Sequence, residues 1–488
     1  MTNRRWLLIL SGILLITFLL RLAFIHEPLE RDEGLYAYVG QVILDGGLPY
    51  RDAIDHKPPG IHYLYAAMIA LAGPTVEAIR LLTALYTLMT VSAVYWCGRR
   101  LWDVETGLAA ACCYGVFSSL PLLHGSSSNT EVFMALPVAL AVSCWFKGDS
   151  TGLRRYFALS GLAVVSALLI KTVVLPVTLL LAALTVARRR GSRKCLGNLA
   201  AFLLPQLFCG GMVIGYFVAQ GAWADFFHWN ITFNRNYGNI GVAGHLAGIG
   251  AVLPKLAEHL YLWVVALPTA GWLMLRARSV PHLLVVLLLV ATLIGVAMPG
   301  QYFPHYFIQT LFPLSLLAGY GLTRLARATG WQRPAGLALA ATAFAGLVAL
   351  EWRYFLVYTP EEVSIQKYGM DNFVKVPRIA RYIRERTRPD ETIFLWGFES
   401  ELYFLTDRRA PNPFTADLFV GASRNPAEAI RLLTKSIRDR RPVYVVVINQ
   451  ENEEFPGFRE LERILASNYF LEKELEGASL FRFMGRKG

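Results

Sequence analysis

Two short motifs bring acids and bases together in one polar stretch near the start of the chain. The letters RDEG occupy residues 31–34, and HKPP occupies residues 56–59. A carboxylate such as Asp32 or Glu33 can accept a proton from a hydroxyl or amine nucleophile. The two prolines stiffen the chain and stop any helix, so the Lys57 ammonium is held at a fixed place that suits a phosphate group. The residue types therefore predict proton transfer and phosphate binding.

Each of these motifs also has a simpler explanation. Asp32 and Glu33 suit the first turn of a helix, where acidic side chains are favourable. Adjacent residues on a helix do not face the same way, so the two carboxylates are expected to have separate roles. Lys57 also suits a lysine that snorkels from a turn at the membrane surface. The motifs alone leave these alternatives open.

Further polar residues stand at the ends of apolar runs. Asn129 or Thr130 can cap a helix that begins at Glu131, although an acid at such a helix end also suits a cavity. Lys171 separates two apolar runs of about 15 residues, each of which is short for a membrane span. An ionisable residue at that depth indicates function more than a snorkelling side chain.

Aromatic residues accumulate in two later stretches. His305 can donate a hydrogen bond to a phosphate oxygen, whereas Tyr302 and Tyr306 are also typical of membrane-interface anchors. The stretch 220–258 combines aromatic and amide side chains. These suit the face and hydroxyls of a sugar, but they equally suit a helix that lies on the bilayer.

The elements that must position these groups are membrane helices. Of the 488 residues, 55% are hydrophobic, and long apolar runs recur from Trp6 to Trp352. This pattern predicts a polytopic α-helical membrane protein with about 11 transmembrane helices, besides outer juxtamembrane helices. The net charge of +12 lies largely in short loops, where it sets orientation and does not indicate nucleic acid.

Charge bias predicts which loops are outside. If Arg99 and Arg100 and the other basic clusters are cytoplasmic, the polar loops at 26–78 and 124–130, the turn at Lys171 and the loop at 300–306 face outward. The chain is then a multi-pass protein of the cytoplasmic (inner) membrane with its active site on the extracytoplasmic side.

The composition changes after Trp352. The sequence predicts a transmembrane domain over 1–352, with 26–78 as the first outer loop, and an extracytoplasmic α/β domain over 353–488. Alternating patterns predict strands at 393–396, 443–448 and 479–483 and helices at 376–385, 427–438 and 458–466.

The order of the motifs resembles a known family. RDEG is followed by Tyr36, and then come HKPP, NTE at 129–131, Lys171, PHYFIQ at 304–309 and WGFESELYFLT at 396–406. This series resembles the bacterial GT-C fold glycosyltransferases of the dolichyl-phosphate-mannose protein mannosyltransferase type, a superfamily that also contains the aminoarabinose transferases of lipid A. The combination of RDEG and HKPP in one outer loop is the more specific part.

The resemblance implies an inverting hexosyl or pentosyl transfer from a polyprenyl-phosphate sugar donor to a lipid, glycan or protein acceptor. It implies that Asp32 is the general base and that Glu33 is its neighbour in the catalytic motif. The other residues that it implies are Lys57, Lys171 and His305 for the donor phosphate, and Arg31, Tyr36, His56, Asn129, Glu131 and Tyr306 for the substrate.

The chemistry limits cofactors. A phosphate leaving group is already anionic, so it needs cations more than protonation, and no cofactor is obligatory. A divalent metal at Asp55 or His56 stays possible. The sequence contains no Gly-rich phosphate loop that would support use of ATP or a nucleotide sugar. The expected partners are the lipid-linked donor, the acceptor and the bilayer.

The chain departs from the family pattern in two places, and two functions other than sugar transfer stay open. The chain lacks the inserted β-trefoil of eukaryotic protein mannosyltransferases, and His56 stands where the aminoarabinose enzymes have Glu, so the acceptor stays open. A transporter or flippase of lipid-linked saccharides is the main alternative, although no two-fold repeat favours it. A third hypothesis is a polymer-assembly or binding scaffold whose C-terminal domain holds a partner.

Overall fold

The chain forms two compact units, and each unit is built from segments that are distant in sequence. The structure is a computed structural model that describes residues 3–121, 123–188, 193–238, 240–276, 279–448 and 457–485. The first unit comprises Met1–Ile25, Arg80–Tyr216 and Asn236–Thr359; the second comprises His26–Ile79, Phe217–Arg235 and Pro360–Gly488. The loop at 26–78, which the sequence assigns to the transmembrane domain, thus groups with C-terminal residues.

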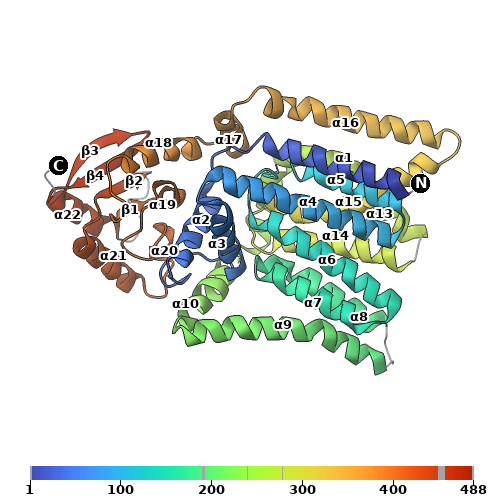
Figure 1. Cartoon of the computed structure of the whole chain (residues 1–488), viewed down its shortest axis with the longest axis horizontal. Helices are drawn as coiled ribbons and strands as arrows, with labels where there is room; N and C mark the ends of the chain where they lie inside the picture. The colour runs from blue at the N-terminus through green and yellow to red at the C-terminus, as the bar shows by residue number, and fades with distance from the viewer. Residues whose placement is uncertain are drawn as a thin grey trace. The chain divides into compact units, whose positions relative to one another are not determined.

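The first unit is a bundle of long apolar helices (Figure 1). Its elements are α1 (Asn3–Leu22), α4 (Val76–Leu101), α5 (Val104–Phe117), α6 (Thr130–Thr151), α7 (Arg154–Leu168), η1 (Thr172–Val174), α8 (Leu175–Arg188), α9 (Arg193–Ala219), α12 (Gly241–Val252), η3 (Leu253–Leu256), α13 (Ala257–Arg276), α14 (Val280–Ala297), η4 (Pro304–Phe307), α15 (Ile308–Arg327) and α16 (Gln332–Leu356).

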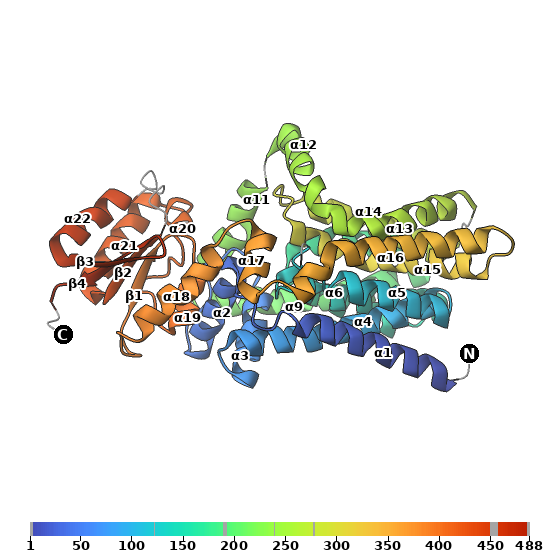
Figure 2. The ribbon, with the colours of Figure 1, turned by 90° about the horizontal axis from the view of Figure 1, so that it is seen from above.

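Helix α15 lies at the centre of this bundle. It packs against α5, α13, α14 and α16, and Figure 2 shows α13, α15 and α16 side by side. Every residue of α15 from Ile308 to Gly321 is buried. A helix satisfies its own backbone hydrogen bonds, which is what an apolar segment needs inside a bilayer.

Six helices within the described residues are long and apolar enough to cross a membrane. Their bounds are Arg4–Leu22, Val76–Leu101, Thr130–Thr151, Lys194–Ala219, Val280–Ala297 and Arg333–Leu356. Other expected spans form shorter apolar helices, such as Val104–Phe117 and Leu260–Leu275. The predicted polytopic helical membrane protein is confirmed, whereas the number of about 11 spans stays a prediction.

The second unit contains a four-stranded sheet and helices from three parts of the chain. The sheet has the strand order β1 (Ile393–Trp396), β2 (Tyr444–Ile448), β4 (Ala478–Phe483) and β3 (Tyr469–Leu475). β1 pairs with β2 in parallel, and β4 is antiparallel to both of its neighbours. The remaining elements are α2 (Arg31–Leu44), α3 (Pro59–Ala72), α10 (Trp223–Phe227), the π-helix η2 (His228–Phe233), α11 (Asn234–Tyr237), α17 (Pro360–Tyr368), α18 (Asn372–Arg384), α19 (Glu401–Thr406), α20 (Leu418–Gly421), α21 (Pro426–Arg440) and α22 (Phe458–Asn468).

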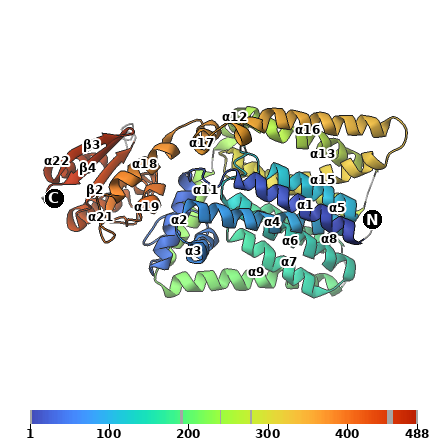
Figure 3. The same cartoon turned by 45° about the horizontal axis from the view of Figure 1, so that its top comes forward.

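The strands differ in how well the sequence predicts them. β1 (Ile393–Trp396), β2 (Tyr444–Ile448) and β4 (Ala478–Phe483) lie where apolar runs predict strands. The sequence pattern does not predict β3 (Tyr469–Leu475), because it is an edge strand in which four of the seven residues are exposed and three are charged. Helices α21 and α22 lie beside the sheet (Figure 3), and Tyr382 of α18 donates a hydrogen bond to Glu472 of β3 at 2.8 Å.

Candidate active site

The first turn of α2 separates the roles of its two adjacent carboxylates. Glu30 caps the helix: its side chain accepts a hydrogen bond from the Asp32 N–H at 3.1 Å. Glu33 completes a capping box by accepting from the Glu30 N–H at 3.0 Å. Glu33 is therefore buried and directed at the helix start, whereas the Asp32 side chain keeps 33% of its surface exposed. The expectation that the two acids face different ways is confirmed.

Gly34 lets α2 approach α19 closely. A Cβ atom at this position would lie 2.1 Å from the Cβ and 2.4 Å from the Cα of Glu401, and a backbone atom cannot move aside cheaply. The last letter of the RDEG motif is therefore a packing requirement. It lets the start of α19 lie against the helix that carries Asp32.

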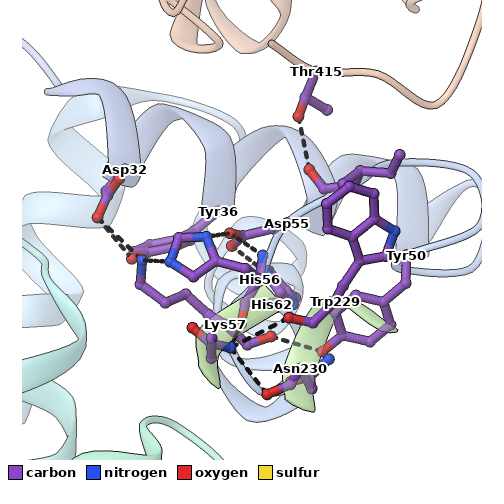
Figure 4. A network of polar contacts seen from close by, with 12 residues as sticks. Asp32, Tyr36, Tyr50, Asp55, His56, Lys57, His62, Trp229, Asn230 and Thr415 are labelled. Atoms are coloured by element: carbon purple, nitrogen blue, oxygen red, sulfur yellow. Dashed lines mark hydrogen bonds and ion pairs between the residues drawn. The ribbon is translucent and has the colours of Figure 1, made fainter. Parts of the chain in front are cut away.

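Asp32 and Lys57 come together although 25 residues separate them. The Lys57 Nζ lies 3.6 Å from Asp32 Oδ2, and the Tyr36 hydroxyl donates to the same oxygen at 3.2 Å. On its other side the Lys57 ammonium lies 2.9 Å from His56 Nε2. Figure 4 shows these side chains converging from α2 and from the turn before α3. The arrangement is a carboxylate and an ammonium held side by side.

The turn that carries Lys57 is fixed through its backbone. The Tyr50 hydroxyl donates to the Lys57 carbonyl at 2.8 Å, and Asn234 Nδ2 donates to the His56 carbonyl at 2.7 Å. Pro59 begins α3 immediately afterwards. Lys57 is buried and ion-paired, so the alternative of a snorkelling lysine is wrong.

A buried acid orients this turn from behind. Asp55 Oδ2 lies 2.7 Å from His62 Nε2, and Asp55 Oδ1 accepts from the His56 N–H at 2.6 Å. Burial alone would raise the pKa of Asp55, but hydrogen bonds from His56 and His62 lower it well below its usual value. Burial and the Lys57 charge lower the pKa of His56. A neutral His56 then accepts a hydrogen bond from Lys57.

Sequence reasoning missed His62, although a signal was present. In the apolar stretch 61–73, His62 is the one basic side chain, and a buried polar group needs a partner. The metal-binding atoms of Asp55 and His56 are engaged by each other, by His62 and by Lys57. Within the described ranges no group of three or more His, Cys, Asp and Glu is placed to hold a metal ion.

Arg31 of the same motif is held by the 396–406 segment. Its guanidinium lies 3.5 Å from the fully buried Glu399 carboxylate and 5.2 Å from the centre of the Phe398 ring. Asn372 donates to the same Glu399 oxygen at 3.0 Å. The sequence could not predict this pair, because 368 residues separate its members. Arg31 is therefore positioned by residues of the α/β part of the unit.

Glu401 is a buried acid at the start of α19. It has no exposed surface, and neither of its carboxyl oxygens has a hydrogen-bond partner within the part of the chain that the structure describes. Burial, and then the charge of Glu399, raise the pKa of Glu401 to about 8, while Arg31 opposes the shift and Asp32 adds to it. Glu401 is therefore mostly protonated at pH 7.

This buried acid predicts a stability that falls with rising pH. The pKa of Glu401 is 4.5 when unfolded and about 8 when folded, so the folded state holds one more proton between these values. Its contribution is complete below pH 4.5 and is lost, by about 1.4 kcal/mol per pH unit, up to pH 8. The Glu401→Gln variant should show a smaller decline in apparent Tm from about pH 6 to 8, measured in detergent. Equal declines would contradict the assignment.

A second cluster lies within the first unit. Lys171, just before η1, forms a buried ion pair with Glu131 of α6, and its Nζ lies 4.1 Å from the centre of the Tyr306 ring. Thr130 donates to the other Glu131 oxygen at 2.9 Å, and His305 packs at 4.7 Å against Tyr306. Lys171 does not snorkel. Positions far apart in sequence thus converge as the motif order implies.

Asn129 occupies the N-cap position of α6, as the sequence allows, but its side chain does not cap the helix. α6 begins at Thr130, and the Asn129 side chain makes no capping hydrogen bond. The side chain is buried, and neither its amide nitrogen nor its oxygen has a hydrogen-bond partner among the described residues. A buried amide in this state lacks the bonds that a ligand or water would supply. The predicted position of Asn129 at the helix start is confirmed, whereas the explanation of its side chain as a hydrogen-bonding cap is wrong.

The aromatic stretch after residue 220 contains both buried and exposed side chains. Trp229 and Phe233 of the π-helix η2 are buried, and the centre of the Phe233 ring lies 5.1 Å from that of the His56 ring, with the two rings tilted by 44°. Trp223 and Phe227 of α10 are exposed, as a helix at a bilayer surface would have them. π-Helical turns are rare and often occur at functional sites. This one supports the HKPP turn.

Known proteins share parts of this sequence. Residues 56–209 match the family described as dolichyl-phosphate-mannose-protein mannosyltransferase. An undecaprenyl phosphate-alpha-4-amino-4-deoxy-L-arabinose arabinosyl transferase from Pseudomonas aeruginosa is 28% identical over 312 residues. The match covers 61% of this chain and 56% of that relative, so the chain spans little more than half of the relative's length.

Solved structures share the fold over nearly the whole chain. ArnT from Cupriavidus metallidurans, bound to undecaprenyl phosphate, has a TM-score of 0.65 at 15% identity and 98% coverage of both chains. The oligosaccharyltransferase AglB from Archaeoglobus fulgidus has a TM-score of 0.54 at 13% identity, covering 98% of this chain and 74% of AglB. This chain therefore shares the fold of ArnT and AglB, and its residues 56–209 are similar to the dolichyl-phosphate-mannose-protein mannosyltransferase family that its motifs resemble.

Proposed function

We propose that this protein is a membrane glycosyltransferase that moves a sugar from a polyprenyl-phosphate donor to a lipid, glycan or protein acceptor. The observation that carries the proposal is the Asp32–Lys57 pair, in which a partly exposed carboxylate lies 3.6 Å from a buried ammonium. The likeness to transferases of undecaprenyl-phosphate-linked aminoarabinose supports a lipid-linked donor. A pentose is the sugar class that this likeness favours.

The proposed step is one inverting displacement. Asp32 takes the proton of the acceptor hydroxyl or amine as the acceptor atom forms its bond to the anomeric carbon. The bond from that carbon to the phosphate oxygen breaks, and the electron pair leaves with the phosphate. The Lys57 ammonium stabilises the negative charge that develops there. Protons and charge balance without a further reactant.

The supporting residues have distinct tasks in this proposal. Tyr36 and Lys57 hold the Asp32 carboxylate, and Arg31 and His56 border the pair as substrate-binding residues. Glu33 supports the start of α2 through the capping box. No cofactor is required by the charge balance, and a divalent metal stays compatible with it.

We assign the second cluster to the lipid-linked substrate. Lys171 and His305 are the proposed phosphate ligands of the first unit, and Glu131 holds the Lys171 ammonium at its place. Asn129 and Tyr306 complete this binding region. The Asn129 amide supports the assignment, because a substrate phosphate or hydroxyl would supply the hydrogen bonds that the described residues do not give it. The basic clusters between the spans support an extracytoplasmic location for the chemistry.

A transfer assay tests this function. Purified protein in liposomes is given a polyprenyl-phosphate donor with a radiolabelled aminoarabinose or hexose and a lipid extract as acceptor. We expect label to move into an acceptor through a new glycosidic bond, with stoichiometric release of polyprenyl phosphate. A transporter would move the labelled donor across the bilayer without forming that bond, and this outcome would replace the proposal.

A further inference from the structure

A cavity of about 720 Å³ lies within the first unit, among α13, α15 and α16. Its walls include Val265, Pro268 and Trp272 of α13, Tyr320 and Arg324 of α15, and Ala335 of α16. None of these residues belongs to the clusters around Asp32 or Lys171. The helices that form the cavity lie side by side in the bundle (Figure 2).

Two arginines of α15 that line this cavity, Arg324 and Arg327, lie one helical turn apart and differ in their ion pairing. The Arg327 guanidinium is paired with Asp103 at 2.8 Å and with Glu105 at 2.5 Å. Arg324 has no carboxylate within ion-pair distance in the described parts of the chain. Its guanidinium centre lies 5.5 Å from the Trp272 ring centre and 5.8 Å from that of Tyr320. Arg324 is therefore a positive charge that aromatic rings hold at the cavity and that no acid of the described residues neutralises.

The rest of the cavity is suited to hydrocarbon. Val264, Val265, Pro268, Leu325 and Ala335 supply apolar surface. α16 is long and apolar enough to cross a membrane, and the α13 segment Leu260–Leu275 is a shorter apolar helix. A water-soluble anion would use the guanidinium but leave the apolar wall uncovered. A molecule that joins an anionic head to acyl chains would cover both.

We propose that this cavity binds an anionic phospholipid. The phosphate accepts hydrogen bonds from the Arg324 guanidinium, for which a planar, two-pronged donor is well matched. The acyl chains lie against Pro268, Leu325 and Ala335. The site is separate from the proposed chemistry, because it needs neither Asp32 nor the lipid-linked donor. Its lipid would stabilise the packing of α13, α15 and α16.

Native mass spectrometry of the full-length protein in detergent tests this site. The wild type is titrated with phosphatidylglycerol, with phosphatidylcholine of the same acyl chains, and with inorganic phosphate. We expect selective retention of phosphatidylglycerol, and about tenfold weaker retention in Arg324→Gln, which corresponds to about 1.4 kcal/mol. Arg327→Gln is the matched control, because Asp103 and Glu105 already occupy that guanidinium; it should retain the lipid like the wild type.

A second variant tests the apolar wall of the cavity. It keeps the proposal testable if Arg324→Gln fails to fold. Ala335→Trp fills the wall without changing any charge, and it should also lose phosphatidylglycerol. Arg324→Lys keeps the charge and should retain part of the binding. Equal retention of both lipids, unchanged binding in Arg324→Gln or in Ala335→Trp, or complete competition by inorganic phosphate would each overturn the proposal. The last result would indicate a simple anion site.

Discussion

Replacing Asp32 with Asn is expected to lower kcat for sugar transfer about 10³-fold, within the range that a general base contributes. Asn keeps the size of the side chain and can still accept the hydrogen bond from Tyr36. It cannot take the acceptor proton, and it no longer forms an ion pair with Lys57. Donor binding should change much less than kcat, because the loss concerns the transition state.

The neighbouring acid supplies a matched control. Glu33→Gln has the same loss of charge one residue away, but Gln can also accept a hydrogen bond in a capping box. We expect this variant to keep most of the transfer activity and the thermal stability of the wild type. The measurement is transfer from a labelled polyprenyl-phosphate sugar by purified variants in liposomes. Undiminished activity in Asp32→Asn, or an equal loss in Glu33→Gln, would remove Asp32 from its assigned role.

The two RDEG carboxylates show how far the sequence reaches into the site. Their adjacency already predicts that they face different ways, because a helix turns by about 100° per residue. What distinguishes them is the cap, and Glu30 is an unusual capping residue beside the preferred Ser, Thr, Asp and Asn. The sequence therefore predicts two separate roles, and the structure indicates which acid lies beside Lys57.

Contacts between side chains that are distant in the chain could not be predicted from local sequence patterns. The proximity of Asp32 and Lys57 follows from a family motif, not from any periodicity in the chain. The Arg31–Glu399 pair joins distant segments, and a local pattern contains no information on it. Asn129 shows the opposite case, in which the sequence predicts a hydrogen bond that the structure does not contain. Its residue type and place predict a helix cap, but the folded chain leaves its amide without that bond.

The secondary structure also divides into elements that the sequence predicts and elements that it does not. Membrane helices are predictable because the bilayer demands long apolar runs, and buried strands such as β2 because all their residues are apolar. In the edge strand β3 four of the seven residues are exposed and three are charged, so its sequence is also compatible with a loop or helix. The grouping of residues 26–79 with the C-terminal part depends on side-chain contacts such as Gly34 against Glu401.

Replacing Lys171 with Met is expected to cause the second large effect, a loss of both stability and activity. The Glu131–Lys171 pair is buried, with 1% and 7% of the two side chains exposed. Removing only the ammonium leaves the Glu131 carboxylate without its cation in a low dielectric, which costs about 3–5 kcal/mol. The measurements are the apparent Tm in detergent and the KM for the lipid-linked donor.

A double variant separates the structural role of Lys171 from its proposed phosphate binding. In Glu131→Gln/Lys171→Met the pair leaves no buried charge, and the introduced glutamine side chain would still accept the hydrogen bond from Thr130. The apparent Tm should therefore return most of the way to the wild-type value. Transfer activity should stay low and the donor KM high, because Lys171, one of the proposed cations for the phosphate, is still missing. If activity returned together with stability, Lys171 would only balance the Glu131 charge, and the phosphate site would have to be sought elsewhere.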